Sequence, residues 1–221
     1  MRLHFELCSN KEPVPFDYQY FLVGVFNKWL KNNEGHNNIS LYSLSWLQQG
    51  HLENGAINFP KGAKWYVSVY DEMLVDKIIK SALVNPKVFC GMEVVKITQQ
   101  HTPQFSDQYT FKVSSPILVH GKQIEGKVKH YIFSDKETDE ILTNTLIHKM
   151  DKANLSEEDK KVKVAFERSY FGAKTKLVKI KGISHRASFC PVKIEGASKA
   201  LQFAWDVGVG HLTGCGFGAL L

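Results

Sequence analysis

The sequence has few cysteines and no closely spaced pair of them. Only four occur among 221 residues, and they are Cys8, Cys90, Cys190 and Cys215. Disulfide frameworks and zinc ribbons need paired spacings that are absent here. His211 precedes Cys215 by four residues and His185 precedes Cys190 by five, but one site would have to gather both pairs. We therefore expect free thiols and no metal ligands.

Long apolar runs are also missing. The best run, residues 21–26, is far shorter than the roughly 20 residues of a membrane-spanning helix. The first seven residues alternate polar and apolar side chains, without the continuous apolar region of a secretory signal. These absences predict a cytoplasmic protein with no membrane partner.

Net charge is concentrated in one segment. The chain carries a formal charge of +6, and residues 149–186 hold eleven basic and five acidic side chains, which account for the whole excess. This segment also contains Tyr170 and Phe171. Lysine and arginine neutralise phosphates and aromatic rings stack on bases, so the segment favours RNA as a ligand. A solvated, lysine-rich hairpin without a ligand is the open alternative.

Apolar periodicity predicts the order β-α-β-β-α-β twice along the chain. Asp17 is expected to cap the first helix, and a turn at 171–173 is expected to join two strands into a basic hairpin. The expected strands are 2–8, 39–47, 65–70, 88–98, 109–113, 128–133, 162–170, 174–180, 185–195 and 217–221, and the expected helices are 17–30, 71–84, 134–152 and 197–207.

This order is typical of two consecutive ferredoxin-like units, an α+β fold with antiparallel sheets. The polar stretch 99–103 is the expected linker. We therefore expect an N-terminal domain over 1–99 and a C-terminal domain over 104–221. Hydrophobic residues make up 43% of the chain, which is enough for a packed core.

The end of the chain is rich in glycine. Residues 208–218 contain five glycines, which favour positive φ and close backbone approach. The run lacks the strand-before-helix context of a dinucleotide fingerprint and the Gly-Lys-Ser/Thr of a phosphate-binding loop. A turn that only permits tight packing remains open. The five positions are Gly208, Gly210, Gly214, Gly216 and Gly218.

Two repeats of glycine-hydrophobic-glycine, residues 208–210 and 216–218, are separated by five residues. This pattern resembles the signature of the CRISPR-associated endoribonucleases that process repeat RNA. Residues 17–24 resemble that family's first helix, 41–45 its second strand and 83–86 the end of its second helix. The resemblance spans nearly the whole chain.

The resemblance implies cleavage of CRISPR repeat RNA without a metal or another cofactor. The 2′-hydroxyl would attack the adjacent phosphate and leave a 2′,3′-cyclic phosphate and a 5′-hydroxyl. His36, in the loop after the first helix, corresponds to the family's catalytic histidine, and His51 is the rival. Some members carry a tyrosine and a lysine where this chain has Asn27 and Ser40, so Ser40 is the candidate second catalytic group.

The candidate RNA-binding residues lie in three places. Lys28 and Lys31 share a face of the first helix, and the five glycines form the tail. The basic segment contributes Arg168, Lys174, Lys176 and Arg186. The expected partners are a CRISPR repeat RNA and a CRISPR interference complex, with the chain as monomer or homodimer. The alternatives are a non-catalytic subunit that binds CRISPR RNA and a metabolic protein that binds a small anion.

Overall fold

The computed structural model describes residues 1–31, 39–124 and 127–221, with the side chains of 122–127 left out. Its N-terminal half is built on an antiparallel sheet in the order β2-β5-β1-β6. The strands are β1 (Arg2–Leu7), β2 (Tyr42–Leu44), β5 (Ala63–Val69) and β6 (Val94–Gln100). This is the strand order of a ferredoxin-like unit.

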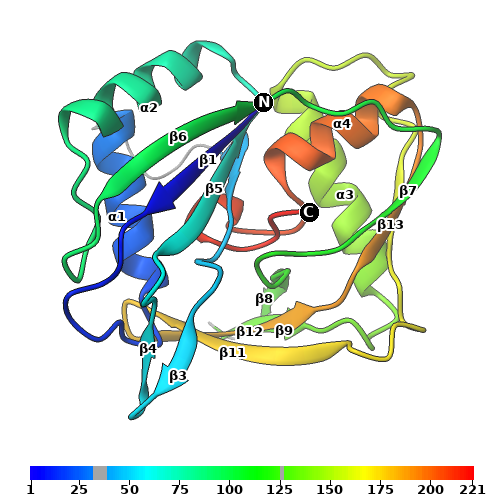
Figure 1. Ribbon diagram of the computed structural model, residues 1–221. Helices are drawn as coiled ribbons and strands as arrows, with labels where there is room; N and C mark the ends of the chain where they lie inside the picture. The colour runs from blue at the N-terminus through cyan, green and yellow to red at the C-terminus, as the bar shows by residue number, and fades with distance from the viewer. Residues whose placement is uncertain (32–38, 125–126) are drawn as a thin grey trace.

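Two helices, α1 (Gln19–Leu30) and α2 (Met73–Val84), cover one face of this sheet (Figure 1). Alternation in β1 places Phe5 in the core, where its ring lies 5.1 Å from Trp29 and 5.3 Å from Trp65 between centroids. The residue before α1 is Tyr18, and no side chain caps the helix. The predicted cap at Asp17 is therefore wrong.

A small hairpin, β3 (His51–Glu53) and β4 (Ala56–Asn58), extends from this half at the lower left of Figure 1. Asn54 and Gly55 form its turn with φ of 49° and 74°. Two positive φ values are typical of a tight hairpin turn. No hairpin was predicted for these residues.

The C-terminal half repeats the same topology with a shorter sheet. Its strands β7 (Gln108–Phe111), β10 (Lys163–Phe166) and β13 (Val192–Glu195) have the order β10-β13-β7. The predicted last strand over 217–221 is reduced to a single bridge between Leu220 and Val113. That bridge occupies the position of the fourth strand beside β7, so the ferredoxin-like order is kept. The predicted α+β fold is confirmed.

The helices of this half are α3 (Thr138–Lys152) and α4 (Ser198–Val207), followed by a short 3₁₀ turn, η1 (Thr213–Cys215). Two hairpins lie at the bottom of Figure 1. One is β8 (Val119–Ile124) with β9 (Lys127–Tyr131), and the other is β11 (Lys174–Ile180) with β12 (Ile183–Phe189).

The predicted pairing within the basic segment is wrong. Residues 162–170 and 174–180 do not pair across 171–173, because β10 pairs with β13 and β11 pairs with β12. The turn of the second hairpin is at Lys181 and Gly182, both with positive φ. The basic hairpin of this protein is therefore formed by β11 and β12.

The described residues form two large apolar cores and a small third one. The first draws on residues 3–97 and the second on 105–220, with Leu41 and Tyr70 of the N-terminal half packed against the second. Gln99 and Gln100 belong to β6 rather than to a linker. The boundaries at 99 and 104 stay a prediction. None of the described helices is long and apolar enough to cross a membrane.

Candidate nucleic-acid interface

The glycine-rich tail is buried and folds back on itself. All five of its glycines are buried, and the amide of Val209 donates to the carbonyl of Gly218 at 3.0 Å. Gly208 has φ of 70°, and a Cβ there would come 2.6 Å from the Gly218 oxygen. A Cβ on Gly218, with φ of 63°, would overlap the Val209 carbonyl. Only glycine fits both the φ and the space at these two positions.

Several glycine amides of the tail have acceptors inside the protein. Gly208 donates to the Ala204 carbonyl at 2.8 Å, and Gly218 donates to the Pro116 carbonyl at 2.9 Å. Gly216 donates to Thr213 at 3.3 Å. Tight packing therefore accounts for Gly208 and Gly218, whereas at Gly216 the φ of 84° favours glycine although a Cβ would have space. Contact between the tail and RNA stays a prediction.

A lysine of α3 that the sequence did not single out forms hydrogen bonds with the tail. Lys149 of α3 is 4% exposed, and its Nζ donates to Thr213 Oγ1 at 3.0 Å. The same Nζ lies 3.3 Å from the carbonyls of Val207 and Gly208, at the end of α4. Burial lowers the pKa of Lys149 to about 7. In the sequence, nothing distinguishes Lys149 from the other basic residues of its segment, so its burial could not be inferred.

Ser40 packs against this tail. A Cβ on Gly214 would overlap Ser40 Oγ and approach the Tyr42 ring at 2.9 Å, so the two segments are in close contact. Burial raises the pKa of Tyr42, and a hydrogen bond with Ser40 opposes that rise. Trp46 adds a tie to the tail, because its Nε1 donates to the Gly216 carbonyl at 2.8 Å. The 3₁₀ turn η1 therefore packs against the residues at the start of β2.

His36 lies outside the described residues. The segment that contains it joins Lys31, the left-handed C-cap of α1, to the residues before β2. Both α1 and β2 contact η1. Its rival His51 begins β3 and is exposed on the small hairpin. The described structure thus brings Ser40 to the tail and places His51 on another element.

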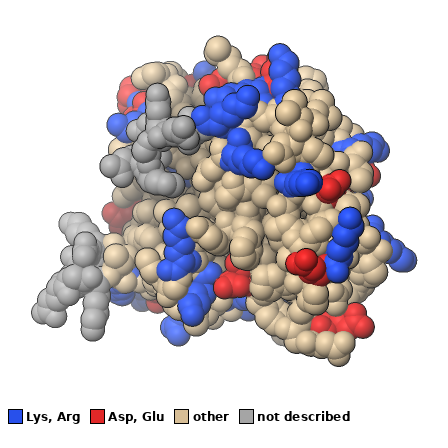
Figure 2. All heavy atoms as spheres, turned by 90° about the vertical axis from the view of Figure 1, so that its left-hand side faces the viewer, with Lys and Arg blue, Asp and Glu red and all other residues tan. Residues whose placement is uncertain are grey.

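Lys28 and Lys31 line a hollow of about 300 Å³ between α1 and α2, together with Lys80. Lys28 also borders a second hollow of about 260 Å³, which is lined by the rings of Tyr20, Phe21 and Phe89. Figure 2 shows basic side chains around a largely uncharged centre on the face that includes these helices. The face combines positive charge with aromatic rings, a combination typical of proteins that bind single-stranded nucleic acids.

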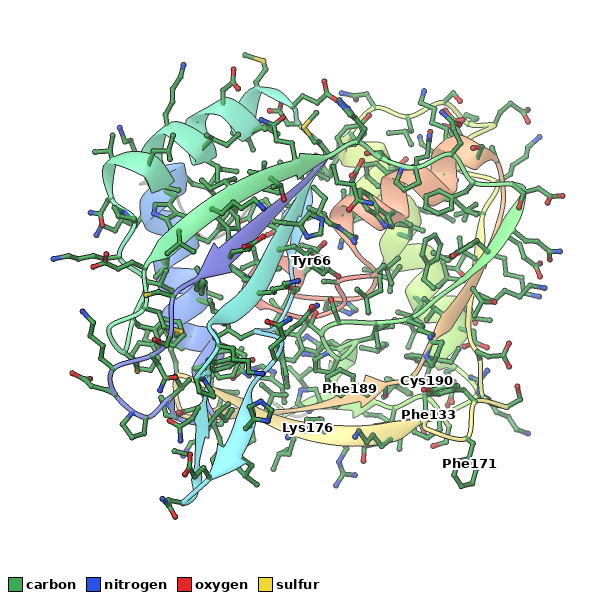
Figure 3. All side chains as sticks on the ribbon, in the orientation of Figure 1. Tyr66, Phe133, Phe171, Lys176, Phe189 and Cys190 are labelled. Atoms are coloured by element: carbon green, nitrogen blue, oxygen red, sulfur yellow. The ribbon has the colours of Figure 1, made fainter. Side chains whose placement is uncertain are left out.

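The four basic candidates of the C-terminal half do not form one patch. Arg168 is held by Asp139 in a bidentate pair at 2.6 and 3.0 Å, and it also donates to the Asp135 carbonyl. On the basic hairpin, alternation and register place Lys174 and Lys176 on one face and Arg186 on the other. Figure 3 shows Lys176 on β11.

Exposed aromatic rings flank the basic hairpin at both ends. Phe171 is fully exposed, at 104%, and projects from the molecule in Figure 3, while Tyr170 is 47% exposed. At the other end, Lys181 Nζ lies 5.3 Å from the ring centroid of Tyr20 on α1. The hairpin therefore reaches from the exposed Phe171 to the aromatic hollow beside α1.

Three histidines distant in sequence come together in the C-terminal half. Each of His120, His130 and His185 offers a ring nitrogen, and these nitrogens lie within 4.8 Å of one another. His120 and His130 are cross-strand partners in β8 and β9. His211 stacks on His120 with centroids 5.1 Å apart. No spacing in the sequence indicated this group, because it arises where β9 and β12 of two separate hairpins come into contact.

A protein-family model matches the C-terminal half of the chain, including the glycine-rich tail. Residues 99–220 match the family model described as CRISPR associated protein Cas6, C-terminal. A comparison with curated proteins finds no match.

Solved structures show the same fold over the full chain. A Cas6-related gene product from Pyrococcus furiosus matches with a TM-score of 0.86 at 18% identity, covering 100% of this chain and 97% of the other. A structure described as CRISPR associated protein Cas6 has a TM-score of 0.82 at 21% identity, covering 100% and 98%.

A third structure, described as a RAMP protein binding different RNA substrates, has a TM-score of 0.84 at 18% identity, covering 100% of this chain and 98% of the other. These likenesses support the fold. The family match includes more than half of the chain and contains the whole glycine-rich tail. The chain therefore belongs to the CRISPR-associated Cas6 family.

Proposed function

We propose that this protein is an endoribonuclease that processes CRISPR repeat RNA. The observation that carries the proposal is the Cas6 family match over residues 99–220, which includes the tail that packs against Ser40. In the sequence, the segment containing His36 ends two residues before Ser40. The lysines of α1 and the aromatic hollow beside them supply a surface for the RNA strand.

The proposed reaction needs two proton transfers and no metal ion. The 2′-hydroxyl attacks the adjacent phosphorus, its proton passes to a base, and the 5′-oxygen leaves with a proton from an acid. The products are a 2′,3′-cyclic phosphate and a 5′-hydroxyl. In this proposal His36 carries one proton, because imidazole titrates near neutral pH. Lys28 and Lys31 stabilise the negative charge on the phosphate.

Ser40 has a different part. A serine hydroxyl does not ionise near neutral pH, so Ser40 Oγ is proposed to donate a hydrogen bond to a phosphate oxygen. One neutral donor stabilises a developing charge less than a lysine ammonium does. We therefore expect slower turnover than in relatives with a lysine at this position.

A cleavage assay tests the proposal directly. Purified protein is incubated with repeat RNA in EDTA, and the product ends are identified. Wild type is expected to cut, and His36→Ala is expected to lose about 100-fold or more in rate. Ser40→Ala should lose less, and His101→Ala, an exposed histidine away from these elements, should cut normally. Equal cutting by His36→Ala, or loss in His51→Ala instead, would contradict the assignment.

A second candidate function is a subunit that binds CRISPR RNA without cutting it. It is favoured by Asn27 and Ser40, which stand where some family members carry a tyrosine and a lysine. A repeat RNA with one 2′-deoxyribose at the cut position separates the two functions. An enzyme binds this RNA and cuts only the ribose form, whereas a binding subunit binds both and cuts neither. The assembly of this protein as a monomer or a homodimer stays a prediction.

A further inference from the structure

We propose that His120, His130 and His185 form a binding site for a divalent transition-metal ion such as Zn²⁺. The site is separate from the proposed RNA chemistry, which uses none of these residues. It would join the β8–β9 hairpin to the basic hairpin beneath the tail.

The three rings are already close to the positions that a metal ion needs. Their centroids lie 5.1 Å apart for His120 and His130, 5.6 Å for His130 and His185, and 5.9 Å for His120 and His185. Zinc–nitrogen bonds of about 2.1 Å place tetrahedral ligands about 3.4 Å apart. The ring nitrogens lie within 4.8 Å of one another, so small side-chain rotations would close the site.

Two of the ring nitrogens lack another role. His120 Nε2 and His185 Nδ1 are buried, and they have no hydrogen-bond partner within the part of the chain that the structure describes. A buried polar atom without a partner costs free energy. A metal ion would satisfy such lone pairs, and this is an observation independent of the clustering itself.

The ligand set also selects the kind of ion. No carboxylate or thiol joins the three histidines among the described residues. Magnesium and calcium prefer oxygen ligands, whereas neutral imidazole suits zinc, nickel, cobalt and copper. Burial lowers the pKa of all three histidines, and Arg186 adds to the effect on His130. This effect favours the neutral imidazole, which is the form that binds metal ions.

Neighbouring residues position the group. His211 Nδ1 accepts a hydrogen bond from the backbone amide of His120 at 3.2 Å. This bond fixes His211 beside the site, and His211 is not one of the proposed ligands. Three ligands leave a fourth position for water. The ring of His185 also packs edge-on against Phe217 of the tail, with centroids 5.7 Å apart. Metal binding would therefore stiffen the contact between the basic hairpin and the tail.

The test is a metal titration of tag-free protein stripped with EDTA. We expect one Zn²⁺ per chain by calorimetry, and one Co²⁺ with the visible absorption of a tetrahedral site. Zinc at about 100 times its Kd should raise Tm by about 5 to 10 °C. Magnesium and calcium should not. His120→Ala/His130→Ala/His185→Ala should lose the binding, and His148→Ala, an exposed histidine on α3, should keep it.

Two results would overturn the proposal. One is the absence of zinc binding by folded wild type at millimolar zinc, which needs no variant. The other is unchanged zinc binding by the triple variant. The single variant His130→Asn removes a less buried ring, and circular dichroism would show whether it folds. It is expected to fold normally and to bind zinc at least tenfold more weakly.

Discussion

The guanidinium carbon of Arg2 lies 3.7 Å from the ring centroid of Trp205, joining β1 of the first unit to α4 of the second. The same guanidinium carbon also lies over the ring of Tyr66, 4.0 Å from its centroid. Arg2 is 3% exposed and donates to Ser68 Oγ at 2.7 Å and to the Leu220 carbonyl at 2.6 Å. The Tyr66 hydroxyl, labelled in Figure 3, donates to the same carbonyl. Arg2 therefore connects the two ferredoxin-like units.

Arg2→Ala is expected to lower the free energy of unfolding by about 3 kcal/mol, because it removes the packing between two rings and leaves the Leu220 carbonyl with one donor fewer. Urea unfolding measures the change. Lys96→Ala is the matched control, since Lys96 makes an exposed pair with Glu6 at 3.3 Å. Such a pair contributes about 0 to 1 kcal/mol. Equal effects of the two variants would show that Arg2 does not connect the units.

Lys149 gives stability an unusual pH dependence. Its pKa falls from 10.5 in the unfolded chain to about 7 in the folded protein. Between these values the unfolded chain binds more protons, so stability rises with pH from about 7 toward 10.5. The gain is at most about 1.4 kcal/mol per pH unit. Urea unfolding of wild type and Lys149→Met between pH 7 and 9 measures it.

Other groups also titrate at alkaline pH, so the difference between wild type and Lys149→Met is the informative quantity. Thr213→Val removes the hydrogen bond from Lys149 Nζ to Thr213 Oγ1 but keeps the lysine. It should therefore preserve the pH slope while lowering stability by about 1 kcal/mol. A slope shared by wild type and Lys149→Met would refute the assignment to this lysine.

Glycine substitutions distinguish packing from helix propensity. Gly218→Ala is expected to destabilise the protein by more than about 2 kcal/mol, because the methyl group would overlap the Val209 carbonyl at a positive φ. Gly24→Ala is the control in the interior of α1, where a new Cβ would meet no atom within 4 Å apart from its chain neighbours and the backbone of its own helix. It should raise stability by about 0.5 to 1 kcal/mol. Thermal unfolding compares the two variants.

Measurements of RNA affinity should distinguish basic residues of the C-terminal half that contact RNA from those that stabilise the fold. Lys176→Ala is expected to weaken binding and to reduce the slope of log K against log salt by about 1, if Lys176 contacts a phosphate. Arg168→Ala should leave the slope unchanged, because Asp139 already binds its guanidinium. It should instead lower stability. Fluorescence anisotropy at several salt concentrations measures both, and a larger slope change for Arg168→Ala would reverse these roles.

Local patterns in the sequence predicted most elements of the fold. Leu3, Phe5 and Leu7 alternate, so they indicated β1 and its buried face. Leu22, Val25, Phe26 and Trp29 recur at helical spacing and indicated α1. The glycine pattern of the tail likewise indicated both its family and its tight backbone, because positive φ values favour glycine.

Strand pairing and burial were decided only in three dimensions. The sequence predicted a strand at 174–180 but paired it with 162–170, whereas β11 pairs with β12 and β10 pairs with β13. Pairing depends on the whole sheet and not on the strand alone. The burial of Lys149 and the meeting of His120 with His185 depend on contacts between segments far apart in the chain. Periodicity is a local property and long-range packing is not, so the sequence alone determined the elements and the family signature, while the tertiary structure decided which polar groups meet.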